Sequence, residues 1–201
     1  MCRTSEPRNI TITKELLRNF PINSDASPSE FIRHYWQHYN DKYESNNSTN
    51  GTIFENLVIL SLARNGINPI YYQTELTYVP SAIFDVFLFS EELSVAISIK
   101  TTLRERWKQA DLEALAIKQV HKSAQCFVVT LSHNEVSARR RNDSTYAGLD
   151  RFILADTTEF DDLINDLSER DFSEAGSFPV VKTNNRFFTP ESINSLFELD
   201  L

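Results

Sequence analysis

The chain has few of the residues that build disulfide frameworks or zinc sites. Cys2 and Cys126 are its two cysteines, and their separation gives neither a disulfide framework nor a metal-ligand spacing. Cys126 lies in an apolar run and is predicted to be a buried small hydrophobe. His34 and His38 are one helical turn apart, but no cysteine or third histidine is spaced to complete a zinc site. We therefore expect a protein without zinc, in a reducing cytoplasm.

Long apolar runs are also missing. No stretch approaches the roughly 18 apolar residues of a membrane span, and residues 1–6 lack the apolar core of a signal peptide. The sequence has no internal repeat, and with 41% apolar residues a chain of this length can bury one good core. We expect no membrane partner and one domain over residues 1–201, with 1–27 as a loosely held N-terminal arm and 28–201 as the core.

Positive charge is scarce overall and unevenly distributed. The net charge of −8 argues against non-specific coating of nucleic acid or of an anionic membrane. From residue 100 to 141, however, nine basic residues oppose four acidic ones, whereas from 156 to 174 eight acidic residues oppose Arg170. A phosphate-facing side can therefore coexist with an acidic outer helix.

Hydrophobic periodicity and turn residues divide the chain into helices and strands. Ser27-Pro28 predicts a capped helix start, residues 46–51 a loop, and Gly66 a helix end. Helices are expected over about 30–43, 52–65, 103–120 and 160–167, and strands over about 70–78, 82–89, 95–101, 125–131 and 152–155, with a late extended piece at 179–188. A hairpin turn at 90–92 and a central strand at 125–131 complete an α/β fold, with a mixed sheet flanked by helices.

One carboxylate interrupts an otherwise apolar strand. Asp85 is the single polar residue of 82–89, and an unpaired buried carboxylate costs several kcal/mol. Either a structural ion pair or a bound metal ion must compensate it, and we favour the metal ion. In the next strand Ala96, Ser98 and Lys100 share one face. Because the first two side chains are small, this face leaves space beside Asp85 for an ion and a phosphate.

Asp85 and Ser98-Ile99-Lys100 resemble the core of the PD-(D/E)xK nucleases, in which two acids hold Mg²⁺ and the lysine positions the attacking water. Phe84 stands at the proline position and Ser98 at the second acid, where a neutral hydroxyl is a poor ligand for a hard cation. One branch of type II restriction endonucleases takes this acid from the following helix, and Glu113 has that spacing from Lys100. The resemblance implies a restriction-endonuclease-like fold with Asp85 and Glu113 as Mg²⁺ ligands.

Arg104-Glu105-Arg106 resembles the block with which the EcoRII and PspGI enzymes of that branch read the CC and GG ends of their sites. Arg106 and Glu113 are seven residues apart and so share one helical face. An arginine can fork onto guanine O6 and N7, and a glutamate can accept from cytosine N4. The alternative for Glu105 is a capping box with Thr102. Capping leaves the two arginines unexplained, so we favour base reading.

Five further residues are candidates for the site. Glu55 resembles the first-helix glutamate that lies near the metal-bound water in this superfamily, although a capping box with Thr52 explains it equally well. Arg139 and Arg140 belong to a basic run that is either solvated or in contact with phosphate. Arg33, with Trp36 or Tyr35, is a candidate for the pocket in which EcoRII-like enzymes stack a flipped central nucleotide. Most aromatic residues at helical spacing are instead core.

The resemblance to the EcoRII and PspGI enzymes implies a type II restriction endonuclease that hydrolyses double-stranded DNA with Mg²⁺ at a CC-x-GG site, and a palindromic site implies a homodimer. One alternative is a nuclease-fold DNA-binding module without cleavage, which the serine at position 98 keeps open. The other is a structure-specific nuclease of repair or mobile-element excision, which would use the same metal site without the Arg-Glu-Arg block.

Overall fold

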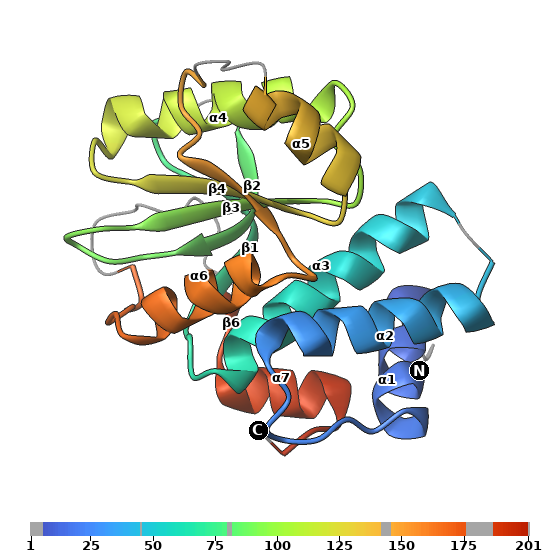
Figure 1. Cartoon of the computed structure of the whole chain (residues 1–201). Coiled ribbons are helices and arrows are strands. Elements are labelled where there is room, and N and C mark those ends of the chain that lie inside the picture. Colours follow the sequence, from blue (N-terminus) through green and yellow to red (C-terminus); the bar gives the residue numbers. More distant parts are fainter. Residues whose placement is uncertain (1–5, 45, 80–81, 142–145, 176–186, 201) are drawn as a thin grey trace.

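The computed structural model describes residues 6–44, 46–79, 82–141, 146–175 and 187–200, which form a six-stranded mixed sheet with helices on both faces (Figure 1). This confirms the predicted fold class. The elements in chain order are α1 (Arg8–Asn19), α2 (Pro28–Lys42), α3 (Asn47–Arg64), β1 (Ile70–Glu75), β2 (Ile83–Leu88), β3 (Val95–Lys100), α4 (Arg106–Val120), β4 (Gln125–Thr130), α5 (His133–Arg141), β5 (Arg151–Leu154), α6 (Thr158–Ser168), β6 (Phe187–Phe188) and α7 (Pro190–Phe197).

The strands lie in the order β5-β4-β3-β2-β1-β6. β2 pairs with β1 and β3 in antiparallel fashion, which confirms the predicted hairpin, whereas β3, β4 and β5 are parallel. β4 is therefore an interior strand, as its apolar pattern predicted. The carboxyl ends of the parallel strands share one edge of the sheet, the usual place for a site in α/β folds. Lys100 ends β3 at this edge.

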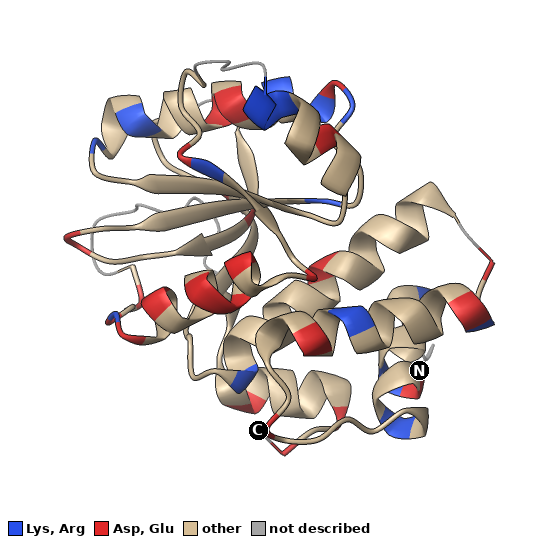
Figure 2. Ribbon diagram, in the orientation of Figure 1, with Lys and Arg blue, Asp and Glu red and all other residues tan. Residues whose placement is uncertain are grey.

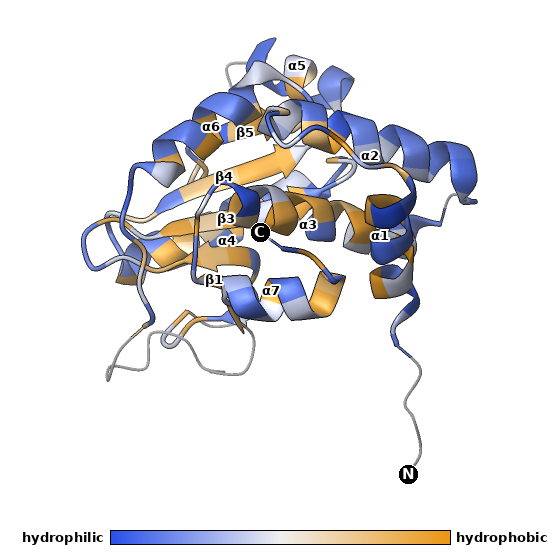
Figure 3. Cartoon of the chain, turned by 90° about the horizontal axis from the view of Figure 1, so that it is seen from below, coloured by the Kyte–Doolittle hydropathy of each residue, from blue (hydrophilic) through white to orange (hydrophobic). Residues whose placement is uncertain are grey.

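Two apolar layers hold the helices against the sheet. One face buries residues from α1, α2, α3, α6 and α7, and the other buries residues from α4 and α5. Figure 3 shows apolar β3, β4 and α3 in the interior, with the more hydrophilic α2, α5 and α6 outside them. Cys126 is 2% exposed, as expected for a small hydrophobe. In the parts of the chain that the structure describes, no helix is long and apolar enough to cross a membrane.

The N-terminal segment is not a loose arm where the structure describes it. Residues 8–19 form α1, and Leu16 on this helix is completely buried in the core. The Lys14 and Arg18 side chains pair with Glu198 at 3.1 and 2.8 Å, which ties α1 to the segment after α7. The prediction for this segment is therefore wrong. Although its sequence is largely polar, α1 carries its apolar residues on one face, and that face packs into the core.

Several helix boundaries differ from the predicted ones. α2 begins at Pro28 with the expected Ser27 cap, and Gly66 follows α3 with a φ of 75°, where glycine is favoured. The predicted loop at 46–51 is wrong, because the Asn46 side chain accepts hydrogen bonds from the backbone and starts α3 at Asn47. Neither α5 nor α7 was predicted. Of the predicted extended piece, 187–188 form β6, and 179–186 lie outside the described residues.

The position of α4 is fixed by a buried carboxylate. Asp111 accepts hydrogen bonds from the backbone N–H groups of Ala147, Gly148 and Leu149 at 2.9 to 3.0 Å. A side chain on Gly148 would bring its Cβ within 2.0 Å of the backbone nitrogen of Leu115, so the close approach requires glycine. These contacts hold α4 against the segment that enters β5.

Candidate functional site

Asp85 lies within β2 and is 8% exposed. One carboxylate oxygen, Oδ2, accepts hydrogen bonds from the Lys100 ammonium and from the backbone N–H of Ile99, both at 2.6 Å. The other oxygen, Oδ1, accepts from the Gln73 amide at 3.0 Å. The ion pair that the sequence left open as an alternative is thus present, and it joins the acid and the lysine of the motif.

Glu55 faces the same site from α3. Because α3 begins at Asn47, Glu55 lies in the body of the helix, and the capping box with Thr52 is excluded. Its Oε2 accepts from the same Gln73 nitrogen, at 3.2 Å. Burial, followed by the nearby negative charge of Asp85, raises the pKa of Glu55 to about 7, while Lys100 and Gln73 oppose this shift.

Glu113 projects from α4 and is half-buried. Its carboxylate accepts a hydrogen bond from Gln109, one turn earlier, at 2.8 Å. Burial raises the pKa of Glu113; Gln109 and the Lys100 charge lower it, and the Asp85 charge raises it further. The charges of Lys100 and Asp85 therefore act on Glu113, as expected for residues of one site.

The chemistry of this donor set suits a hard divalent cation. Asp85, Glu55 and Glu113 offer only oxygen ligands, which Mg²⁺ prefers, and the charges of Asp85 and Lys100 act on both glutamates. Within the described ranges, no three acidic, histidine or cysteine side chains stand close enough together to hold an ion. The Gln73 amide lies between Glu55 and Asp85. The residues fit Mg²⁺ in kind.

The raised pKa of Glu55 predicts a pH-dependent stability of the metal-free protein. The pKa of Glu55 is about 7 in the folded chain, above its ordinary value of 4.5. The protonated carboxyl of Glu55 therefore stabilises the fold in full below pH 4.5, and this contribution is lost as the pH rises through 7. The difference is up to about 3 kcal/mol. In urea denaturation, Glu55→Gln should therefore gain stability over the wild type at pH 8 and little at pH 4.5. Glu91→Gln, at an exposed turn residue, is the control, and an equal gain at both pH values would contradict the prediction.

The Arg-Glu-Arg segment lies just before and at the start of α4, and all three side chains are exposed. α4 begins at Arg106, so Thr102 does not cap it and the capping alternative for Glu105 is wrong. The Glu105 carboxylate instead pairs with Lys108 at 2.5 Å. The backbone of the segment is held from α5, because the Glu135 carboxylate accepts hydrogen bonds from the backbone N–H groups of Leu103 and Arg104 at 2.8 and 2.7 Å.

The basic run of α5 divides into two kinds of side chain. The guanidinium of Arg139 lies 4.8 Å from the centre of the Trp107 ring, which brings it next to the Arg-Glu-Arg segment. Arg140 instead makes a bidentate ion pair with Glu159 at 2.7 and 2.8 Å and donates to the carbonyl oxygen of Phe152. These contacts favour a structural role for Arg140, joining α5 to β5 and α6.

The aromatic helix α2 mostly faces the core. Tyr35 is 3% exposed, so its ring cannot receive a flipped base as it stands. Trp36 is half-buried and packs on Tyr39 and Phe54, with ring centres 5.4 and 5.7 Å apart. Arg33 donates to the carbonyl oxygen of Asp156 at 2.9 Å. The structure thus does not bring Arg33 and Tyr35 or Trp36 together as a stacking pocket.

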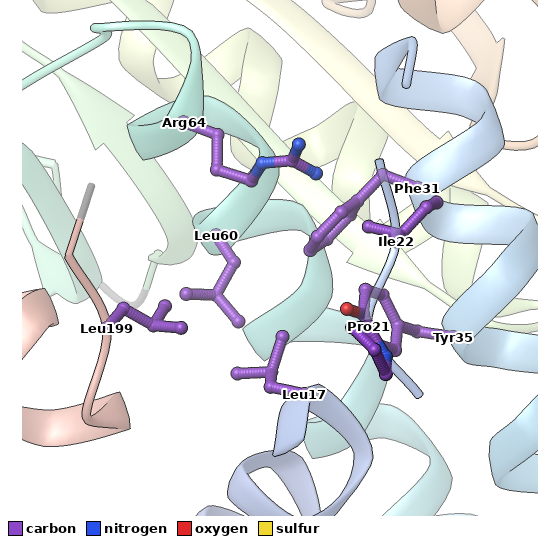
Figure 4. A pocket seen from close by; sticks show the side chains of 8 residues that line it. All are labelled: Leu17, Pro21, Ile22, Phe31, Tyr35, Leu60, Arg64 and Leu199. Atoms are coloured by element: carbon purple, nitrogen blue, oxygen red, sulfur yellow. The ribbon is translucent and has the colours of Figure 1, made fainter. Parts of the chain in front are cut away.

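The apolar cavity in Figure 4 is a separate feature. Its volume is about 210 Å³, and it lies between α1, α2, α3 and the C-terminal segment. Its lining comprises Leu17, Pro21, Ile22, Phe31, Tyr35, Leu60, Arg64 and Leu199. The carboxylates and basic residues described above do not contribute to this lining, so the cavity is not part of the candidate site.

Sequence reasoning missed two residues of the site. Gln73 contacts both Glu55 and Asp85, but a glutamine among mixed polar and apolar strand residues carries no recognisable signal. Glu135 holds the Arg-Glu-Arg backbone from 31 or more residues away in the chain. A prediction of α5 would have placed Glu135 in a first helical turn, but would not have identified its partners.

No protein-family model matches the chain, and no curated protein does. Among solved structures, the chain is similar to the restriction endonuclease PspGI in complex with its substrate DNA, with a TM-score of 0.50 and 16% sequence identity. The similarity covers 94% of this chain and 87% of that one. At this identity the similarity demonstrates a restriction-endonuclease-like fold.

Proposed function

We propose that this chain is a Mg²⁺-dependent type II site-specific deoxyribonuclease of the PD-(D/E)xK kind, with its second acid on α4. One observation carries the proposal: inside a restriction-endonuclease-like fold, Lys100 contacts Asp85 at 2.6 Å. The electrostatic coupling of Glu113 to both groups supports it.

Asp85 and Glu113 would hold Mg²⁺, which when bound supplies positive charge for the developing charge on a phosphodiester. Lys100, at the carboxyl edge of the sheet, would orient the attacking water. Glu55, with a pKa raised to about 7, would accept a hydrogen bond or a proton from that water at neutral pH. The chain's own residues thus cover ligand binding, water orientation and proton transfer.

Double-stranded DNA is the proposed partner, read by Arg104, Glu105 and Arg106, with Arg139 near phosphate. Figure 2 shows basic residues on α4 and α5 and acidic residues on α6, which supports a phosphate-facing side within an acidic chain. We propose that residues 1–201 form one domain with one active site. Because a CC-x-GG site is palindromic around its centre, two copies of the chain would act on it as a homodimer. We also propose a cytoplasmic location.

Cleavage of a plasmid library with random inserts tests this function directly. The wild-type protein with Mg²⁺ should yield ends that cluster at CC-x-GG when they are sequenced. Ends at junctions or distorted DNA without a shared sequence would favour the structure-specific nuclease instead. Selective retention of a sequence without any cleavage would favour the DNA-binding module.

Flipping of the central nucleotide is part of the same proposal, with the half-buried Trp36 as the stacking ring; Arg33, which donates to the Asp156 carbonyl oxygen, is not part of this contact. Extruding a base costs a few kcal/mol, and stacking on an aromatic ring returns about 1 to 3 kcal/mol. When the protein binds a CC-x-GG duplex with 2-aminopurine at the centre, in Ca²⁺ in place of Mg²⁺, the 2-aminopurine fluorescence should therefore increase. Trp36→Ala should bind more weakly and leave the flipped base brighter, because the quenching ring is gone. An unchanged signal in both proteins would mean that the base stays stacked and that Trp36 is core.

A further inference from the structure

Gln73 has an unusual backbone conformation for a strand residue. Its φ is 45°, in the left-handed backbone region that residues other than glycine, asparagine and aspartate rarely adopt. The register of β1 with β2 runs from Tyr72↔Val86 to Thr74↔Phe84, so Gln73 stands opposite Asp85 between two regular pairs. Such conformations persist where the surroundings hold them, and they concentrate at functional sites.

The amide of Gln73 joins two acidic side chains from different elements. Its Nε2 lies 3.0 Å from Asp85 Oδ1 on β2 and 3.2 Å from Glu55 Oε2 on α3. A primary amide nitrogen carries two hydrogens, one for each carboxylate. The hydrogen bonds therefore hold together two groups that would otherwise repel each other.

The three donors to Asp85 differ in kind. Oδ2 is held by the Lys100 ammonium and a backbone N–H, and Oδ1 by the neutral amide of Gln73. A second ammonium at position 73 would cancel the negative charge that attracts a cation, whereas an amide orients the oxygens and leaves their charge in place. Asparagine would suit the left-handed backbone better, but its shorter side chain would not span both carboxylates. The choice of glutamine thus reflects the reach of its amide.

We propose that Gln73 is a positioning residue of the metal site, which fixes the oxygens of Glu55 and Asp85 before the cation binds. Hydrogen-bonded support of ligating carboxylates is general in metal sites. The inference rests on the proposed function, because it takes Asp85 to be a metal ligand.

Calorimetric titration of Mn²⁺ into the full-length protein tests this role without DNA. Gln73→Asn and Gln73→Gly both suit the backbone and remove the bridge, and each should weaken Mn²⁺ binding by about 10- to 100-fold. Tyr78→Asn is the matched control, because Tyr78 also has a positive φ, of 64°, and its side chain is 80% exposed. This control should bind Mn²⁺ like the wild type.

Gln73→Glu gives a second measurement, since it keeps the length of the side chain and turns the donor into a third carboxylate. Without metal it should melt at a lower temperature than the wild type, and Mn²⁺ should restore the loss. Wild-type Mn²⁺ affinity in Gln73→Asn and Gln73→Gly, or an unchanged metal-free melting temperature in Gln73→Glu, would overturn the proposal for Gln73. Mn²⁺ binding that survives Asp85→Ala would instead overturn the metal site itself, so the two failures are distinguishable.

Discussion

Asp85→Asn is expected to abolish Mg²⁺-dependent cleavage while DNA binding persists. The substitution keeps the shape of the side chain but removes the charge that a divalent cation requires. A metal ion contributes several kcal/mol of transition-state stabilisation, and each 1.36 kcal/mol is a factor of ten in rate. Single-turnover cleavage should therefore slow by at least about 10³-fold. Asparagine is preferable to alanine because its amide oxygen can still accept from Lys100 and Ile99, which donate to the same oxygen of Asp85.

Glu113→Gln should produce a loss of the same size if α4 supplies the second acid. Ser98→Ala is the matched control, since Ser98 is buried on the same face of β3 as Lys100 and stands at the position of the missing acid. Its effect should be mild. Gel-shift binding with Ca²⁺ and thermal melting would show that the variants still fold and bind DNA. Loss of cleavage in Ser98→Ala together with retained cleavage in Glu113→Gln would contradict the assignment of Glu113, and not Ser98, as the second metal ligand.

The contact at the centre of the site followed from local patterns. Strand alternation and a short turn at 90–92 were enough to place Asp85 and Lys100 on adjoining strands, and the structure brings them to 2.6 Å. These patterns depend on residues near one another in sequence, where the strand period decides which side chains share a face. The spacing of Glu113 from Lys100 likewise involves one loop and the start of one helix.

The remaining contacts depend on packing between distant elements. Asn46 converted a segment of loop-like composition into the start of α3, and this moved Glu55 from a cap position into the helix body. The left-handed conformation of Gln73 has no sequence signature, because it depends on what lies opposite in β2. Arg139 and Arg140 are adjacent in the chain, yet one lies over Trp107 and the other pairs with Glu159. Only the placement of α5 against α4 and α6 separates their roles.

Arg106→Ala is expected to remove the preference for one G·C pair. The side chain is exposed at the first residue of α4, and a bidentate contact to guanine is worth about 1 to 3 kcal/mol of discrimination. The ratio of cleavage rates on the preferred and the substituted site should therefore fall by about 5- to 150-fold. Arg106→Lys should lose most of the same preference, because an ammonium keeps the charge without the planar fork.

Arg141→Ala is the control for general phosphate attraction, because Arg141 is exposed at the end of α5 and outside the Arg-Glu-Arg segment. Loss of this charge should weaken binding to all sequences alike and lower the slope of log affinity against log salt by about one. Competition cleavage on a panel of single-base variants of the site, at two salt concentrations, measures both quantities. Equal loss of affinity on every sequence in Arg106→Ala would make that arginine a phosphate contact, because base reading must change the ratio between sequences rather than the affinity for all of them.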